Sequence, residues 1–193
     1  MYIHPLTIIF ARHTRTDDND ATIYSSQNDV PLNTIGHKQA TALADTLKKR
    51  SLTAIYTSDL LRARTVAEII GAHHPHAPII PDQRLRELNM GRLTGMTRAA
   101  VLERYPEPHF RTDHPQYDFS SVGGERRSEV IGRELELLRE LEARYGRDEP
   151  TTILVVGHGT ALRDLFTTVP GPVITLHEQG GYTEWNFSLP SDR

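Results

Sequence analysis

The chain has 193 residues, of which 37% are hydrophobic and 24% are charged, and its formal net charge at pH 7 is −3. This length suits one α/β domain better than two, the composition is ordinary for a globular protein, and the charge argues against a nucleic-acid partner or an acidic membrane surface. Because there is no cysteine, disulfides, thiol nucleophiles and thiolate metal ligands are excluded.

The apolar runs of the chain are too short to span a bilayer, since the longest reach only about six residues. The first five residues contain no basic region followed by a longer apolar stretch, so no secretory signal is expected. These features predict a cytoplasmic protein without a membrane partner. We expect residues 1–193 to form a single domain.

The first predicted element is a buried strand over residues 6–11, because a short apolar run stops there at the polar Arg12 and His13. A polar loop follows to about residue 33. Helical periodicity then predicts a helix over residues 34–50. Its apolar stripe is expected to contain Ile35, Ala40, Ala42, Leu43, Ala44 and Leu47.

A short strand is predicted next, over residues 54–56. Thr57 and Ser58 follow it and are typical N-cap residues for a helix over residues 59–73. Residues 79–80 are expected to add a brief edge strand.

The least regular stretch covers about residues 92–123, with a short helix at 97–105 followed by three prolines. We interpret this stretch as a segment that caps a substrate pocket. A strongly charged helix is predicted over residues 125–145. Its apolar face is expected to contain Ile131, Leu135, Leu138 and Leu141.

A second central strand is predicted over residues 151–156, where another apolar run stops before His158. A helix follows at 161–169, and residues 173–177 and 182–187 are expected to be closing strands. Strands that alternate with helices predict a mostly parallel sheet with helices on both faces, that is, a three-layer α/β/α sandwich.

Five side chains are expected to meet at one end of this sheet, because the carboxyl ends of parallel strands open into a common crevice. Two arginines and the helix N-termini would bind a phosphoryl group. A histidine there can attack phosphorus and carry the phosphoryl group, and a carboxylic acid can protonate the leaving alcohol. The five residues are Arg12, His13, Arg62, Glu87 and His158.

On these residues the chain resembles the histidine phosphatase superfamily, the phosphoglycerate-mutase-like proteins, over nearly its whole length. Within that family it is most similar to the small ribazole-phosphate and broad-specificity phosphatases. Six blocks carry the resemblance, in the family's order: residues 12–16 (Arg-His-Thr-Arg-Thr), 29–40, 56–63 (with Ser-Asp-Leu-Leu-Arg-Ala), 85–91 (with Leu-Arg-Glu), 123–125 (Gly-Gly-Glu) and 155–159 (with Gly-His-Gly, and Arg163 beyond).

The resemblance implies a phosphoglycerate-mutase-like fold and a metal-independent phosphatase without a cofactor. It implies that His13 is the phosphorylated nucleophile, that Arg12, Arg62 and His158 bind the phosphate, and that Glu87 protonates the leaving oxygen and later assists water. It places further substrate contacts at seven positions: Thr16, Asn19, Ser25, Ser26, Asn89, Gly159 and Thr160.

The chain departs from the family pattern at three places. Thr14 replaces the glycine after the nucleophile, and a glycine allows backbone angles that threonine disfavours. Arg126 stands where serine is usual, and Leu93 and Thr94 replace a Trp-Glu pair. None of these changes removes a catalytic group, so they bear on substrate identity and on the shape of the loop around Thr14.

The expected partner is a small phosphorylated metabolite. Only about thirty residues, 92–123, separate the Glu87 loop from the Gly-Gly-Glu block. So short a cap would protect a phosphohistidine poorly from water, which favours hydrolysis over a mutase reaction. A phosphoglycerate-type mutase, a protein phosphohistidine phosphatase and a catalytically silent binding module remain alternatives, and the closing strands allow a homodimer. Possible substrate contacts in the cap are His109, Arg111, His114 and Tyr117, with aromatic surface from Tyr105, Phe110 and Phe119.

Simpler interpretations exist for several of these residues. Arg62 can pair with Asp59 or Glu68 instead of binding phosphate. Gly157 and Gly159 after a strand suggest dinucleotide binding, but the third glycine of that motif is missing. The histidines of residues 73–76 suggest a metal site, but they have no carboxylate partner and are interpreted as solvated. Arg126 and Arg127 begin an exposed helix face, with contact to the pocket as the alternative.

Overall fold

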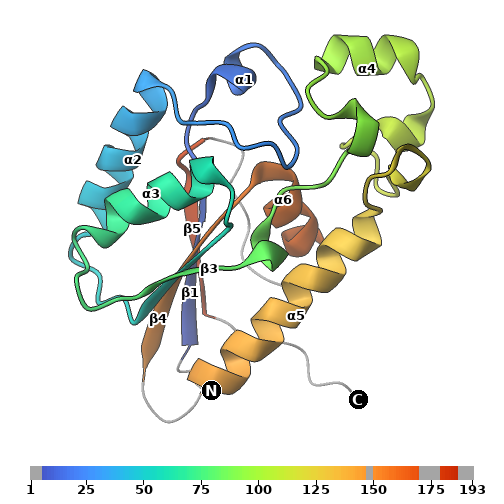
Figure 1. Ribbon diagram of the computed structural model, residues 1–193. Helices are drawn as coiled ribbons and strands as arrows, with labels where there is room; N and C mark the ends of the chain where they lie inside the picture. Colours follow the sequence, from blue (N-terminus) through green and yellow to red (C-terminus); the bar gives the residue numbers. More distant parts are fainter. Residues whose placement is uncertain (1–5, 147–149, 170–178, 187–193) are drawn as a thin grey trace.

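The computed structural model of the protein describes residues 6–146, 150–169 and 179–186. A five-stranded sheet forms its centre (Figure 1). The first four strands in spatial order are parallel, and the last runs antiparallel to its neighbour. In spatial order the strands are β3 (Ile79–Pro81), β2 (Ala54–Thr57), β4 (Thr151–Gly157), β1 (Leu6–Arg12) and β5 (Tyr182–Asn186).

Helices cover both faces of the sheet (Figure 1). The helices α2 (Thr34–Leu47) and α3 (Leu61–Gly71) pack on one face, and α5 (Arg127–Tyr145) and α6 (Gly159–Thr168) pack on the other. This arrangement confirms the predicted three-layer α/β/α sandwich with a mostly parallel sheet.

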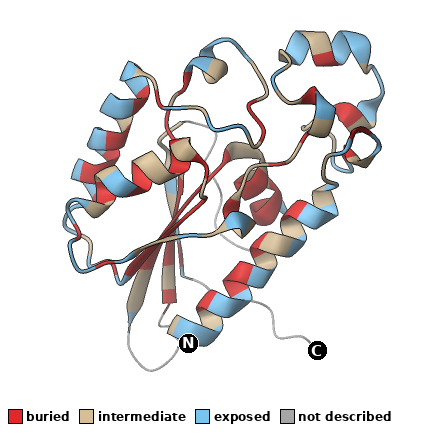
Figure 2. Ribbon diagram, viewed as in Figure 1, coloured by how far each residue is buried: buried red, intermediate tan, exposed pale blue. Residues whose placement is uncertain are grey.

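The central strands are buried on both faces, so successive side chains enter two different apolar clusters (Figure 2). In β1, Ile8 and Phe10 pack toward α5 and α6, whereas Ile9 and Ala11 pack toward α2 and α3. All four are fully buried. The apolar run that predicted β1 is thus explained by a strand without a solvent face.

A third apolar cluster lies in the capping segment, away from the sheet (Figure 1). It contains side chains such as Leu93, Val101 and Phe119, each of which is at most 1% exposed. The irregular stretch therefore has a small apolar core, to which Val130 of α5 and Ala161 of α6 also contribute. The short elements outside the sandwich are α1 (Asp17–Asp20), α4 (Arg98–Arg104), η1 (Gln83–Leu85), η2 (Gly91–Leu93), η3 (Pro108–Phe110) and η4 (Ser120–Val122).

The predicted start of α3 is wrong by two residues. The helix begins at Leu61, and Leu60 occupies the N-cap position without a side-chain hydrogen bond. Ser58 accepts a hydrogen bond from the Leu60 N–H, and Asp59 forms an ion pair with Arg86. The polar residues that suggested a cap are therefore committed to the turn before the helix.

The predicted apolar stripes were also partly wrong. In α2, Ile35 is 48% exposed and Ala42 is exposed as well. The buried face of α5 consists of Val130, Glu134, Leu137, Leu138 and Leu141. Ile131 and Leu135 lie at its edge. The sequence of α5 fits two overlapping helix faces. The observed buried face includes Glu134, and because a glutamate is expected on the solvent side, periodicity alone favours the other face.

Two smaller outcomes complete the fold. The predicted closing strand at 182–187 is observed as β5, whereas the one predicted at 173–177 lies outside the described residues. Among the described residues, no helix combines the length and the apolar character needed to cross a bilayer.

Candidate active site

The two histidines come together because β1 and β4 are neighbours that end at the same level. Arg12 is paired with Gly157 in the parallel register, and the His13 N–H donates to the Gly157 carbonyl oxygen at 3.0 Å. The rings of His13 and His158 lie 5.2 Å apart between centroids. Both are buried, with exposed fractions of 4% and 0%.

His13 is held in the form that a nucleophile requires. Its Nδ1–H donates to the Thr14 carbonyl oxygen at 2.7 Å, and this acceptor assigns the tautomer that leaves the lone pair on Nε2. Burial, and then the positive charges of Arg62 and Arg12, lower the pKa of the imidazole well below its usual value. The ring is therefore neutral at pH 7.

The ring of His158 is fully buried next to that of His13. Within the described part of the chain, neither Nδ1 nor Nε2 has a hydrogen-bond partner. Burial lowers the pKa of the ring, and the charge of Arg62 lowers it further. Buried polar atoms are normally satisfied, so a buried imidazole with two open nitrogens is typical of a site that receives a polar ligand.

Arg12 is the last residue of β1, and its guanidinium group lies directly against Gly159. A Cβ atom at position 159 would lie 2.8 Å from Arg12 Cζ, closer than side chains approach. Burial lowers the pKa of Arg12, but arginine remains charged at neutral pH. Gly159, predicted as a substrate contact, therefore gives space to the arginine and does not line the pocket.

Arg62 lies in the first turn of α3 and is only 2% exposed. Its Nη2 donates to the Ser26 carbonyl oxygen at 2.7 Å and its Nη1 to that of Asn28 at 2.8 Å. Ser26 has a φ of 48°, so the loop makes a tight turn around this guanidinium group. The simpler interpretation of Arg62 is wrong, because Asp59 pairs with Arg86 instead.

Glu87 reaches the pocket from the loop after η1 and lies on the first turn of α6. Its carboxylate accepts hydrogen bonds from the N–H groups of Leu88 (2.9 Å), Thr160 (3.1 Å) and Ala161 (3.1 Å). Unpaired amides at a helix N-terminus favour a negative group. The carboxylate is thus fixed between its own loop and the helix that follows His158.

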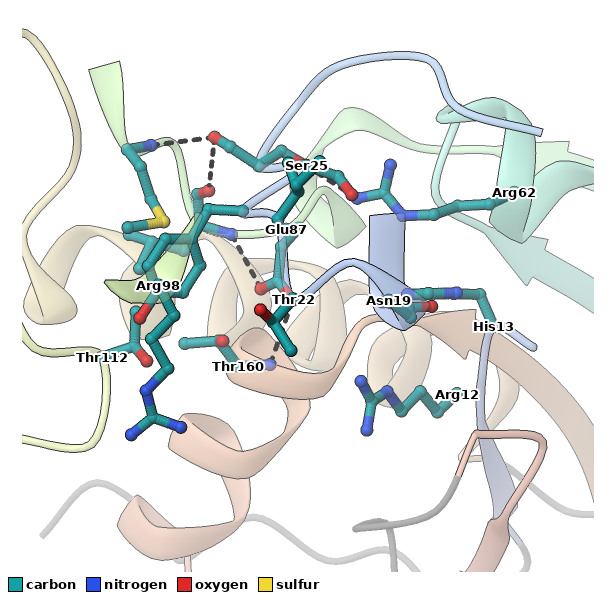
Figure 3. Close-up of a pocket in the computed structure, with 15 residues that line it drawn as sticks. Arg12, His13, Asn19, Thr22, Ser25, Arg62, Glu87, Arg98, Thr112 and Thr160 are labelled. Carbon is teal, nitrogen blue, oxygen red and sulfur yellow. Dashed lines mark hydrogen bonds between the residues drawn. The ribbon is translucent and has the colours of Figure 1, made fainter. Parts of the chain in front are cut away.

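A pocket of about 260 Å³ lies between these groups (Figure 3). Arg12, His13 and Arg62 lie on one side of it in this view, and Arg98 and Thr112 on the other. The predicted site residues that line the pocket are Arg12, His13, Asn19, Ser25, Ser26, Arg62, Glu87 and Thr160.

Three predicted site residues, besides Gly159, lie outside this lining. His158 is next to His13 and fully buried. Thr16 is the N-cap of α1, where its hydroxyl accepts from the Asn19 N–H. Asn89 accepts from the Gly91 N–H within its own turn. Thr16 and Asn89 therefore shape loops, and their direct contact with a substrate stays a prediction.

The residues of the capping segment that were predicted as possible substrate contacts lie outside the lining of this pocket. His109, Arg111, His114 and Tyr117 do not line the pocket, and the buried Tyr117 hydroxyl donates to Asp164 at 2.6 Å. Phe110 and Phe119 are buried in the third apolar cluster, and Tyr105 packs against it. Of the two arginines at the start of α5, Arg126 pairs with Asp118 and Arg127 with Asp164.

Sequence reasoning missed the residues that form the opposite wall. Four of them, Thr22, Ile23, Tyr24 and Arg98, come together by pairing between residues 22–24 and 95–98. The Tyr24 N–H donates to the Met96 carbonyl oxygen and the Arg98 N–H to the Thr22 carbonyl oxygen, both at 2.9 Å. No local pattern signals such pairing between distant loops. The missed lining residues are Thr22, Ile23, Tyr24, Leu88, Met90, Arg98 and Thr112.

The departure at Thr14 is tolerated by the backbone. Among the described residues other than glycine, only Thr22 and Ser26 have a positive φ. Thr14 therefore does not need the freedom of a glycine, and its carbonyl still accepts from His13. As for metal ligands, no group of three His, Asp or Glu side chains suited to a metal ion gathers within the described residues.

Comparisons with known proteins agree with this geometry. Residues 8–177 match the model of the histidine phosphatase superfamily, branch 1. Phosphoserine phosphatase 1 of Hydrogenobacter thermophilus is 30% identical over 94% of this chain and 84% of its own length. A probable phosphoglycerate mutase GpmB of Serratia proteamaculans is 34% identical over 86% of this chain and 75% of its length.

Two further relatives bear on the chemistry. The metal-independent phosphoserine phosphatase of Arabidopsis thaliana is 30% identical over 84% of this chain and 68% of its own length. A solved structure of a mycobacterial glucosyl-3-phosphoglycerate phosphatase in complex with VO3 superposes with a TM-score of 0.77 and 29% identity, covering 92% of this chain and 91% of that one.

Proposed function

Because the chain belongs to the histidine phosphatase superfamily, branch 1, we propose that it is a metal-independent phosphatase that hydrolyses a small phosphomonoester through a phosphohistidine on His13. The observation that carries the proposal is the state of His13. Its imidazole is buried and neutral, with Nδ1 bonded to the Thr14 carbonyl and Nε2 available to attack.

In the first half-reaction, His13 Nε2 attacks phosphorus. A nitrogen–phosphorus bond forms, the bond from phosphorus to the ester oxygen breaks, and the leaving oxygen takes a proton from the Glu87 carboxyl group. Arg12 and Arg62 balance the charge that develops on the phosphoryl oxygens. The neutral ring of His158 can donate one further hydrogen bond to the same group, through the nitrogen that carries its proton.

In the second half-reaction, water attacks the phosphohistidine. Glu87, now a carboxylate, takes a proton from the water as the oxygen–phosphorus bond forms and the nitrogen–phosphorus bond breaks. Inorganic phosphate leaves and His13 returns to its neutral form. Two guanidinium groups and a helix N-terminus provide the positive field that a metal ion provides in other phosphatases.

Arg98 supports a narrower substrate class. It is a third cationic side chain of the pocket, on the wall opposite His13 (Figure 3). A pocket of about 260 Å³ lies at the small end for ligand sites. Phosphoserine and glucosyl-3-phosphoglycerate, named in two of the relatives, each carry a carboxylate near the phosphate ester. We infer a small phosphomonoester with a carboxylate that reaches Arg98.

A mutase reaction is the second candidate, because a probable phosphoglycerate mutase is among the relatives. Both reactions pass through the same phosphohistidine and differ in what accepts the phosphoryl group. The cytoplasmic location, the absence of a cofactor and a possible homodimer stay predictions from the sequence.

The test is an assay of released phosphate with O-phosphoserine, 3-phosphoglycerate and glycerol 3-phosphate, with a metal chelator present. We expect faster release from the two carboxylate-bearing esters and no effect of the chelator. Isomerisation of 3-phosphoglycerate that outpaces phosphate release would favour the mutase. Equal rates for the wild type and His13→Ala would support a catalytically silent binding module.

A further inference from the structure

Arg133 of α5 forms hydrogen bonds with the backbone of residues 84–89, the segment that carries Glu87. The Arg133 side chain is only 16% exposed. Its Nη1 donates to the Arg84 carbonyl oxygen at 2.6 Å, and its Nη2 donates to the Glu87 carbonyl oxygen at 3.2 Å. One guanidinium group thus fixes the backbone of this segment at two points.

Glu125, two residues before α5, holds the far end of the same segment. Its N–H donates to the Asn89 carbonyl oxygen and its Oε2 accepts from the Asn89 N–H, both at 2.8 Å. The same carboxylate accepts from Arg133 through Nε (3.0 Å) and Nη2 (3.3 Å). Arg133, Glu125 and the backbone of the segment therefore form a closed ring of hydrogen bonds.

The same segment also forms hydrogen bonds with the loops that carry Asp59 and Gln27. Arg86 forms two hydrogen bonds to Asp59, at 2.7 and 2.6 Å, and Gln27 donates to the Glu87 carbonyl oxygen at 3.0 Å. Neither Arg133 nor Glu125 lines the pocket. A bound ester therefore does not touch them, and their hydrogen bonds reach Glu87 through the backbone of its segment.

We propose that Arg133 and Glu125 are positioning residues that place the Glu87 carboxyl group for proton transfer to the leaving oxygen. This inference rests on the proposed function, in which Glu87 is the proton donor. A general acid acts within hydrogen-bond reach of its target, and a displacement of about 1 Å costs roughly 100-fold in rate. Arginine suits the position because its planar fork serves two carbonyls and a carboxylate at once, which the single ammonium of lysine does not.

The inference has a signature that a purely structural role lacks. An alkoxide leaving group needs a proton as it departs, whereas p-nitrophenolate spreads its charge over the ring and leaves without one. Misplacing Glu87 therefore slows the hydrolysis of an alkyl phosphate far more than that of p-nitrophenyl phosphate. The phosphate side is not involved, so inhibition by inorganic phosphate stays unchanged.

The experiment measures kcat/KM with O-phosphoserine and with p-nitrophenyl phosphate for Arg133→Lys and Glu125→Gln, because kcat/KM reports the phosphorylation of His13 and not the later hydrolysis of the phosphohistidine, which both esters share. We expect a loss of about 100-fold with the alkyl ester and of less than about 3-fold with the aryl ester. Glu87→Gln sets the ratio for a lost acid. Arg139→Lys, an exposed arginine of the same helix, is the matched control and keeps the wild-type ratio. Both rates come from one preparation, so an unfolded fraction cancels from their ratio.

Equal losses with both esters in Arg133→Lys and Glu125→Gln would overturn the inference and leave the proposed function intact, provided that Glu87→Gln shifts the ratio. If Glu87→Gln leaves the ratio unchanged, Glu87 is not the acid and the positioning role falls with it. Wild-type rates in His13→Ala would remove the proposed function itself, so the two failures are distinguishable.

Discussion

The two sides of the pocket differ in how they are built. On the phosphate side, His13, Arg62 and His158 are 4%, 2% and 0% exposed and sit at the ends of central strands or on the first turn of a helix. On the opposite side, the Arg98 side chain is 56% exposed, and its ion pair with Asp113 is 3.7 Å long.

The contrast follows from what each side binds. The phosphoryl group is common to all substrates of this kind, and burial keeps the charged and neutral groups around it fixed before the substrate arrives. The rest of the substrate meets exposed groups on a segment with a small apolar core. Substitutions on the phosphate side should therefore change the rate of the chemical step, and substitutions in the cap should change substrate preference.

Replacing the nucleophile gives the largest expected effect. We expect His13→Gln to lower kcat by roughly 10⁴-fold or more for every ester, because the covalent route is lost. Steady-state kinetics measure the loss, and mass spectrometry of enzyme quenched at high pH detects the phosphohistidine in the wild type. A residual rate within tenfold of the wild type would remove the distinction between the two sides.

Glu134 tests the cost of burying charge behind the phosphate side. Burial raises its pKa to about 8, with the negative charges of Glu87, Asp164 and Glu125 adding to the shift and Arg133 opposing it. Its Oε2 has no hydrogen-bond partner among the described residues. The folded protein therefore holds this proton more tightly than the unfolded chain, and stability falls as the pH rises from the unfolded pKa toward 8.

We expect Glu134→Gln to remove this part of the pH dependence. From a shift of this size, the stability gained above pH 8 is at most about 5 kcal/mol, and near pH 4 the variant and the wild type should be similar. Thermal unfolding between pH 4 and 9 measures the difference. Parallel curves for the two proteins would show that Glu134 is charged in the folded state.

Gly159 tests how tightly the phosphate side is packed. A methyl group at position 159 would lie 2.8 Å from Arg12 Cζ, so Gly159→Ala forces the guanidinium group aside. We expect kcat/KM to fall by about 100-fold, the usual cost of misplacing a binding group by about 1 Å.

Gly132→Ala is the matched control, because a Cβ there meets nothing within 4 Å. It lies on an exposed part of α5, so we expect unchanged kinetics and a gain of about 0.5–1 kcal/mol in stability. If Gly159→Ala behaves like this control, Arg12 has room to move and the phosphate side is less rigid than its burial indicates.

The difference between the two sides also explains what the sequence could predict. The phosphate side can be predicted from short stretches of sequence, because apolar runs indicate the strands and the polar residues directly after them indicate the crevice. His13, His158 and the mostly parallel sheet around them follow from that pattern. The role of Gly159 does not, because a glycine that makes room for Arg12 looks like any other glycine in the sequence.

The opposite wall depends on contacts that no local pattern reveals. Arg98 reaches the pocket because residues 22–24 pair with residues 95–98, far along the chain. The buried face of α5 was missed for a related reason: Glu134 faces the interior, and periodicity assigns such a residue to solvent. The role of Arg133 could not be predicted either, because it is one of many charged residues of α5 and only its contacts distinguish it from the exposed Arg139.

Arg98 gives the smallest expected effect and the sharpest test of the contrast. Because it is exposed, its contact with a carboxylate contributes little, and we expect Arg98→Gln to raise KM for O-phosphoserine by about tenfold, or about 1.4 kcal/mol, with little change in kcat. The KM for p-nitrophenyl phosphate, which has no carboxylate, should stay the same. Arg104→Gln, at the other end of α4, is the control. Equal increases in KM for both esters would mean that Arg98 attracts the phosphate itself, and the division of labour between the two walls would be lost.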